Sequence, residues 1–304
     1  MARGAPKFLG PATTQCVDGP DPPEQMSASI LIPAHNEESV LARTLDALLG
    51  SNDSPEFEVL VVCNGCKDRS AQVARRYVPR LRVAELPVAS KTAALNLGDQ
   101  ECGGYPRIYL DADVTLSEVS ALALIGALES GAMAAEPKRV FEIQASSPFV
   151  RAYYTVWNAL HGAEPGDLGC GVLAMSREGR ARFGEFPDVI SDDGFARAHF
   201  APGEIVVVEQ AQVAVLAPRT IRALIAIKTR SRLGVLELQA RFPKLWKEKR
   251  ASTLSVRRKL LAMPLRYWPM LPLYTLIQLF VRRRARARFA DLSSYQWERD
   301  ESSR

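Results

Sequence analysis

Short apolar, β-branched stretches alternate with helix-forming stretches between residues 28 and 110. The apolar runs at 28–32, 58–62, 81–85 and 107–110 are each predicted to form a strand. The first strand is followed by a helix that we expect Asn36 to cap and Gly50 to end. Strands and helices that alternate at this spacing form right-handed βαβ units. The sequence therefore predicts an α/β fold built on a mainly parallel sheet.

Further elements are expected up to a boundary near residue 218. Thr115 and Glu118 form a capping-box pattern that would open a helix ending at Gly131. A strand is predicted at 169–175, and a strand pair or one bent strand at 205–215. We divide the chain into a flexible tail at 1–26, a main domain at 27–220, a basic helical extension at 221–259, and an apolar membrane-associating segment with an Arg-rich tail at 260–304.

Charge is distributed unevenly between the two ends of the chain. Residues 1–218 carry 18 Lys/Arg and 28 Asp/Glu, a net of −10, whereas residues 219–304 carry 21 and 6, a net of +15. The basic residues of the second part are interleaved with apolar runs. This mixture favours an anionic membrane surface as the partner and argues against nucleic acid.

The membrane prediction rests on the stretch 260–281, which is mostly apolar. Its longest uncharged part, 267–281, has 15 residues and is followed at once by a cluster of arginines. A spanning helix needs about 20 apolar residues. We therefore expect a peripheral or re-entrant attachment at the cytoplasmic face of the membrane. A single span and a soluble helix packed on the domain are the alternatives.

The five cysteines are an odd number scattered through the chain, which argues for a reducing compartment. Residues 1–26 lack the apolar core of a secretory signal. Cys63 and Cys66 form a C-x-x-C pair, which is typical of redox or zinc sites. Because there is no second such pair and the three histidines are dispersed, we interpret these cysteines as small apolar side chains around a turn.

Two acidic pairs and one lysine are candidates for chemistry. Asp111 and Asp113 follow a predicted strand, where both carboxylates of an extended chain would face one ligand and suit Mg²⁺ or Mn²⁺. Asp192 and Asp193 are adjacent, so one can serve as a proton acceptor. Lys91 opens a helix, where it could meet a phosphate. Solvated helix caps and an ordinary surface lysine are the competing interpretations.

Taken together, these segments resemble glycosyltransferase family 2. The resemblance rests on the following blocks, in the family's order: Ile-Leu-Ile-Pro-Ala-His-Asn-Glu-Glu at 30–38, Val-Val-Cys-Asn-Gly-Cys-Lys-Asp at 61–68, Ser-Lys-Thr-Ala-Ala-Leu-Asn-Leu-Gly at 90–98, Tyr-Leu-Asp-Ala-Asp at 109–113, Gly-Cys-Gly-Val-Leu-Ala-Met-Ser-Arg at 169–177 and Ser-Asp-Asp-Gly-Phe at 191–195.

The resemblance implies a GT-A fold, a nucleoside diphosphate sugar as donor, a divalent cation and inversion at the anomeric carbon. It implies a role for each matching residue: Pro33, Ala34 and Glu37 in the first donor-binding loop, Asn64 beside the nucleotide base, Lys91 near the diphosphate, Asp111 near ribose and metal, Asp113 as a metal ligand, and Asp193 as catalytic base with Asp192 as the first acid of its pair.

The chain departs from the family's pattern in two places. Cys63-Asn64 replaces an acidic base-reading residue, which leaves the nucleotide base open. The signature of processive synthases is absent. Arg230 and Arg232 lie in roughly that region and are candidates for holding phosphate.

The predicted function is thus transfer of a sugar onto a hydroxyl of a glycan or a lipid-linked acceptor. The alternatives are a non-catalytic, membrane-bound nucleotide-sugar sensor or scaffold, and a sugar-phosphate nucleotidyltransferase. The latter should carry a Gly-rich phosphate loop between residues 30 and 41, and none is present.

Overall fold

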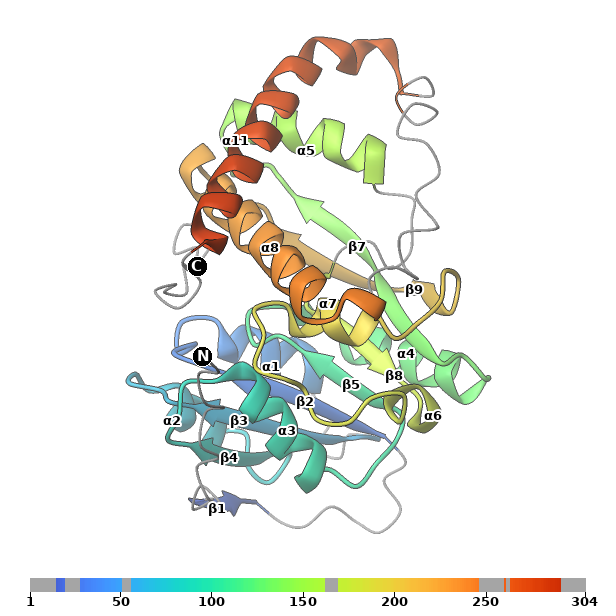
Figure 1. Cartoon of the computed structure of the whole chain (residues 1–304). Helices are drawn as coiled ribbons and strands as arrows, with labels where there is room; N and C mark the ends of the chain where they lie inside the picture. The colour runs from blue at the N-terminus through green and yellow to red at the C-terminus, as the bar shows by residue number, and fades with distance from the viewer. Residues whose placement is uncertain are drawn as a thin grey trace, which may run out of the picture.

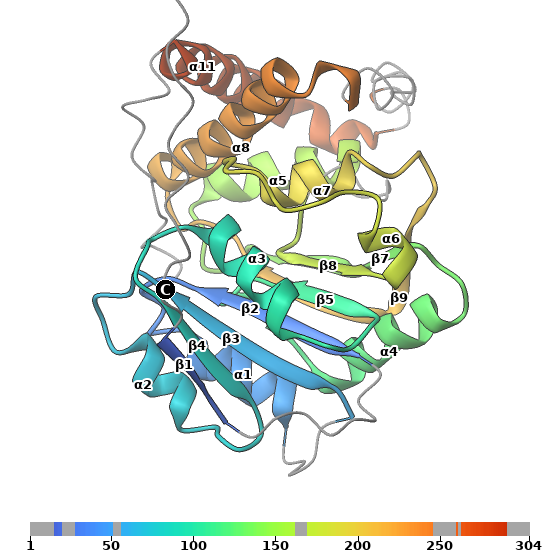
Figure 2. The same cartoon turned by 60° about the horizontal axis from the view of Figure 1, so that its bottom comes forward.

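The computed structural model describes residues 15–19, 28–50, 56–161, 169–245, 260 and 263–290. These residues form a nine-stranded mixed sheet in the order β1-β4-β3-β2-β5-β8-β7-β9-β6 (Figure 2). β2, β3, β4 and β5 are parallel, and β8 pairs antiparallel to β5. The strands are β1 (Gln15–Asp18), β2 (Ser29–Ala34), β3 (Glu58–Asn64), β4 (Arg82–Leu86), β5 (Arg107–Leu110), β6 (Thr115–Leu116), β7 (Ala134–Glu142), β8 (Val172–Met175) and β9 (Ile205–Leu216).

Helices cover both faces of this sheet. One face packs against α1 (Leu41–Leu49), α2 (Ser70–Arg75) and α4 (Glu118–Glu129), and the other against α3 (Lys91–Glu101) and α7 (Asp192–Arg197), with α6 (Arg177–Arg180) after β8. Along β2, Ile30 and Ile32 enter the first core while Leu31 enters the second, and all three are fully buried. Strands that are buried on both faces consist of continuous runs of apolar residues, which is why they could be predicted from the sequence.

A third layer of helices lies beyond the sheet and is the upper part of the molecule in Figure 1. It consists of α5 (Pro148–His161), α8 (Ile221–Arg241), a 3-10 turn (Leu265–Met270) and α11 (Leu271–Phe289). Tyr153 and Trp157 of α5, Leu224 of α8, and Ile277 and Val281 of α11 pack into one apolar cluster. In the described part of the chain, no helix combines the length and the apolar character needed to cross a membrane.

The structure corrects three local predictions. Asn36 does not cap α1, which begins at Leu41; it adopts a left-handed backbone with φ of 52°. The cap of α4 is Ser117, whose hydroxyl accepts the N–H of Ser120, because Thr115 belongs to β6. Inside the predicted tail, residues 15–18 form β1 at the sheet edge.

The packing of α3 on the sheet depends on a glycine. A Cβ on Gly98 would lie 2.1 Å from Leu31 Cδ1, which is fully buried, whereas a Cβ on Gly126 of α4 would meet nothing within 4 Å. The α3 backbone therefore approaches β2 more closely than it could if any residue other than glycine stood at position 98.

We expect Gly98→Ala to lower the free energy of unfolding by about 1–3 kcal/mol through overpacking. The matched change Gly126→Ala should raise it by up to about 1 kcal/mol, because alanine favours the helix where space is open. Denaturant unfolding of both variants checks this. A Gly98→Ala protein as stable as the wild type would contradict the packing described for α3.

Candidate active site

Polar side chains from three segments gather in a cleft at the carboxyl ends of β2 and β5, with about 390 Å³ of space that is open to solvent. Open α/β sheets bind ligands at this edge. The cleft is lined by five of the predicted site residues: Pro33, Lys91, Asp111, Asp192 and Asp193. Apolar and aromatic side chains, including Leu95, Tyr109 and Phe186, form its remaining wall.

Lys91 joins the two acidic pairs. It is the first residue of α3, whose N-terminus is capped by the hydroxyl of Ser90 accepting the N–H of Ala93. Lys91 Nζ lies 2.7 Å from Asp111 Oδ1 and 3.0 Å from Asp192 Oδ2. Burial alone would lower the pKa of Lys91, but the two carboxylates raise it well above its usual value. Lys91 is therefore a fixed positive charge at the centre of the cleft.

Asp111 lies where β5 ends in a tight turn. Its backbone N–H donates to the carbonyl of Gly171, and its carbonyl accepts the N–H of Val114. The pair follows a strand as predicted, but the backbone from Asp111 to Asp113 turns and is not extended; Asp111 is half-buried and Asp113 is exposed. Burial, opposed by Lys91 and reinforced by the charges of Asp192 and Asp113, raises the pKa of Asp111 to about 6.

The carboxylates around Lys91 fit a divalent cation. Asp111 feels the negative charges of both Asp113 and Asp192, so negative charge exceeds what one ammonium neutralises. Mg²⁺ is usually held by one or two carboxylates, with substrate phosphates and water completing its ligands. The described residues contain no group of three or more His, Cys, Asp or Glu placed to hold a metal on their own.

Asp193 is held by a buried arginine. Arg197 Nη1 lies 2.6 Å from Asp193 Oδ2, and Arg197 Nε lies 2.5 Å from Glu136 Oε1 on β7. The other oxygen of Asp193 accepts from the hydroxyl of Ser191 and the N–H of Gly194. Burial would raise the pKa of Asp193, but the charges of Arg197 and Lys91 and these hydrogen bonds lower it to about 2. Asp193 is therefore ionised at neutral pH.

Arg197 and Glu136 were not among the predicted site residues. Arg197 stands four residues after Asp193, a spacing that places two side chains on one helix face, and this signal could have found it. Glu136 is far away in the sequence, and only the packing of β7 against α7 brings it there.

The loop that was predicted to bind the donor lies beside the cleft. Ala34 ends β2 and pairs with Cys63 of β3, and the amide of Asn64 donates to the carbonyl of Ala34. Asn64 is 2% exposed, so its side chain ties the two strand ends together and does not face the cleft. The N–H of Glu37 donates to the hydroxyl of Ser70. Ala34, Glu37 and Asn64 thus shape the loop without lining the cleft.

The cysteine interpretation holds for Cys63, which is buried in the core. Cys66 is half-exposed, and its sulfur accepts the N–H of Asn36 at 3.4 Å. The interaction with Cys63 and this N–H lower the pKa of Cys66 to about 7 against an opposing effect of burial.

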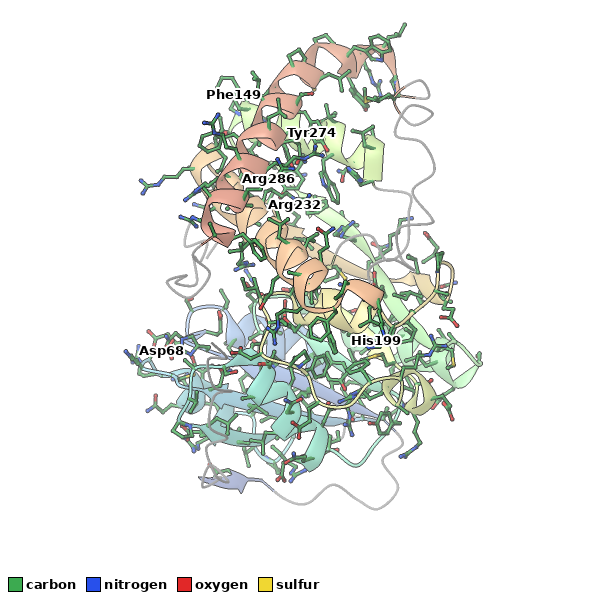
Figure 3. All side chains as sticks on the ribbon, in the orientation of Figure 1. Asp68, Phe149, His199, Arg232, Tyr274 and Arg286 are labelled. Carbon is green, nitrogen blue, oxygen red and sulfur yellow. The ribbon has the colours of Figure 1, made fainter. Side chains whose placement is uncertain are left out.

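Arg230 and Arg232 lie on α8 and do not line the cleft. Arg232 faces α11 (Figure 3), where burial and the charges of Arg282 and Arg286 lower its pKa. The prediction placed both arginines near the phosphates of the donor. The N-terminal part of α8 packs against α5 and α11 and its C-terminal part against α7, and Arg232 lies where α8 faces α11.

Comparison with known proteins gives relatives of one kind. Residues 29–168 match the model of glycosyl transferase family 2. The chain is 28% identical over 110 residues to a probable glycosyltransferase, YdaM, of Bacillus subtilis, which covers 34% of this chain and 26% of that protein. It is 34% identical over 122 residues to dolichyl-phosphate beta-glucosyltransferase of Drosophila melanogaster, covering 35% of this chain and 37% of that protein. The matches thus span about a quarter to a third of these relatives' lengths.

Among solved structures, the chain resembles mannosyltransferase PcManGT from Pyrobaculum calidifontis, determined in complex with GDP-Man and Mn²⁺. The TM-score is 0.56 at 19% identity, covering 89% of this chain and 76% of that one. At this identity the likeness shows the fold, which is the expected GT-A arrangement of sheet and helices. The matched residues 29–168 contain Lys91, Asp111 and Asp113. Residues 29–168 therefore match glycosyl transferase family 2, and both curated relatives are glycosyltransferases.

Proposed function

We propose that this protein transfers a sugar from a nucleoside diphosphate sugar to an acceptor hydroxyl, with inversion at the anomeric carbon. The observation that carries the proposal is the position of Lys91 between Asp111 and Asp192, beside Asp193 in one cleft. This arrangement offers a positive charge to a diphosphate and a carboxylate to a hydroxyl within the same space. The solved relative with GDP-Man and Mn²⁺ supports a donor and a cation of this kind.

The leaving group of such a reaction is a nucleoside diphosphate, whose developing charge must be neutralised. Lys91 contributes one positive charge and orients the diphosphate at the N-terminus of α3. Asp111 and Asp113 would hold Mg²⁺ or Mn²⁺, and the bound cation would supply further neutralisation of the diphosphate.

Asp193 is the proposed proton acceptor. Its low pKa makes it a weak base, but a weak base suffices when the attacking hydroxyl becomes strongly acidic as its bond to the anomeric carbon forms. Arg197 and Ser191 keep the carboxylate ionised and oriented. Single displacement, with the base on the acceptor side, leads to inversion.

Purified full-length protein should release nucleoside diphosphate from one donor in a panel of nucleotide sugars when Mg²⁺ or Mn²⁺ is present. Asp113→Ala should lower this rate by about a hundredfold or more, since it removes a proposed metal ligand. Glu129→Ala, at the exposed end of α4, is the control and should leave the rate unchanged. Metal-dependent donor binding without turnover, even with lipid acceptors supplied, would favour a nucleotide-sugar sensor instead.

Asp193→Asn keeps the shape of the side chain and removes its ability to take a proton. We expect kcat to fall by about 10²–10⁴-fold while donor binding is preserved. Pre-steady-state turnover and equilibrium titration of the donor separate these two effects. Near-normal turnover by this variant would exclude Asp193 as the base and direct attention to Asp192.

We also propose that α11 attaches the protein to an anionic membrane at its cytoplasmic face. The outward residues Leu276, Leu279 and Phe280 are 66%, 56% and 56% exposed, and Trp268 is 45% exposed. Their spacing places Leu276, Leu279 and Phe280 on one helix face. Arg282, Arg283 and Arg286 follow and are exposed. Apolar side chains that enter the interface beside basic residues are typical of peripheral amphipathic helices.

The double change Leu276→Ser and Phe280→Ser should weaken binding to phosphatidylcholine vesicles containing phosphatidylglycerol by about tenfold or more, because two apolar side chains lose their burial. Vesicle flotation measures this, and binding by the wild type should fall at high salt. Val119→Ser, 73% exposed on α4, is the matched control. Equal binding by the double variant and the wild type would rule out this face of α11 as the membrane contact.

A further inference from the structure

A second group of positive charges lies in the helical layer, outside the donor cleft. Lys228 of α8 reaches into a ring of aromatic side chains from α5: its Nζ is 5.8, 5.2 and 4.8 Å from the ring centroids of Tyr153, Tyr154 and Trp157. Arg139 of β7 lies against the same layer, with its Cζ 4.9 Å from the centroid of Trp157. Trp157 is thus in contact with both cations.

The charge of Lys228 is not balanced by a carboxylate. In the parts of the chain that the structure describes, no Asp or Glu side chain lies within ion-pair distance of its Nζ. Burial and the positive charge of Arg139 lower the pKa of Lys228 to about 7. The groups that surround it are Arg139 from β7 and the rings of α5, and Tyr274 of α11 packs on Tyr153. The attraction of a cation to aromatic faces is weaker than the free-energy cost of burying its charge. A bound anion would therefore stabilise the charge of Lys228.

This group of charges lies next to the acceptor side of the donor cleft. The charges of Glu136 and Arg197, which hold Asp193, act directly on Arg139. Arg139 is therefore near the charges that surround the proposed base as well as near Lys228. An anion bound at Lys228 would belong to a molecule whose other end can approach Asp193. The charged end of Lys228 lies among buried rings, but Lys228 and Arg139 each keep part of their side chain exposed to solvent.

We propose that Lys228 and Arg139 bind a phosphate group carried by the acceptor. The inference rests on the proposed function, and it defines the acceptor class as a phosphorylated molecule. A phosphate is compact, multiply charged and able to accept hydrogen bonds from both an ammonium and a guanidinium. The phosphate could come from a lipid phosphate at the membrane or from a soluble phosphate ester, and the chemistry of the site is the same for both.

The test uses the full chain and three variants. Lys228→Met keeps the apolar stem and removes the charge, Lys228→Arg keeps the charge, and Lys138→Met removes an exposed lysine of β7 that pairs with Glu209. Each protein is titrated with glycerol 1-phosphate by calorimetry. In a second arm, each is floated with phosphatidylcholine vesicles with and without hexadecyl phosphate.

We expect the wild type to bind phosphate in at least one arm, and Lys228→Met to bind about tenfold more weakly or worse. Lys228→Arg and Lys138→Met should bind like the wild type. Binding in the soluble arm identifies a free phosphate ester, and binding only on doped vesicles identifies a lipid phosphate. Equal binding by Lys228→Met and the wild type, or no phosphate binding by the wild type in either arm, would overturn the proposal.

Lys228→Met is expected to fold, and its pH dependence checks that Lys228 is buried as described. The folded pKa of Lys228 lies below its unfolded value, so the unfolded chain binds more protons between the two values. The stability of the wild type relative to Lys228→Met should therefore rise with pH between about 7 and 10. A difference in melting temperature that stays constant over this range would contradict the burial of this charge.

Nucleoside diphosphate release is measured on the same samples, which separates the two proposals. Release by the wild type without any phosphate binding would overturn the inference and leave the proposed function standing. Phosphate binding that depends on Lys228, without release from any donor, would overturn the proposed function and with it the acceptor role of the phosphate.

Discussion

The contact of Lys91 with Asp111 and Asp192 is the interaction on which the site depends. It joins the first residue of α3, the turn after β5 and the start of α7, three segments that are distant in the sequence. Each of these segments is placed by the sheet, and α3 reaches its position because Gly98 allows it to lie close to Leu31. A charged cluster buried at a sheet edge is stable only when its charges are paired. The same pairing keeps the cleft ready for a charged donor.

A second group of ion pairs, centred on an arginine, connects the cleft to the helical layer. Arg197, 2% exposed in its side chain, bridges Asp193 on its own helix and Glu136 on β7. β7 then continues to Arg139, whose neighbour Trp157 belongs to α5. The donor cleft and the third layer of helices are thus connected through buried and half-buried charges. We infer that the sheet edge binds the nucleotide sugar, while the helical layer, above the sheet in Figure 1, binds the acceptor and the membrane.

Much of the fold could be predicted because its signals are local. Apolar runs predicted β2, β3 and β5, and the family resemblance assigned Lys91, Asp111 and Asp193 to one site. In the structure these three residues line one cleft. The errors arose where tertiary contacts override local preference. Asn36 adopts a left-handed backbone conformation, in which its side chain accepts the N–H of Lys67 in the neighbouring loop. Long-range partners such as Glu136 leave no pattern near the residues they contact.

The most direct test of the proposed donor site is whether the cleft binds Mn²⁺ and a nucleoside diphosphate together. Electron paramagnetic resonance of free aqueous Mn²⁺, titrated with the full chain and either UDP or GDP, measures it. We expect the free Mn²⁺ signal to fall strongly only when one of these nucleotides is present, and Asp113→Ala and Lys91→Met each to weaken this joint binding. A free Mn²⁺ signal that stays unchanged with both nucleotides, or an equal loss of signal in Asp113→Ala, would contradict a metal-assisted donor site in this cleft.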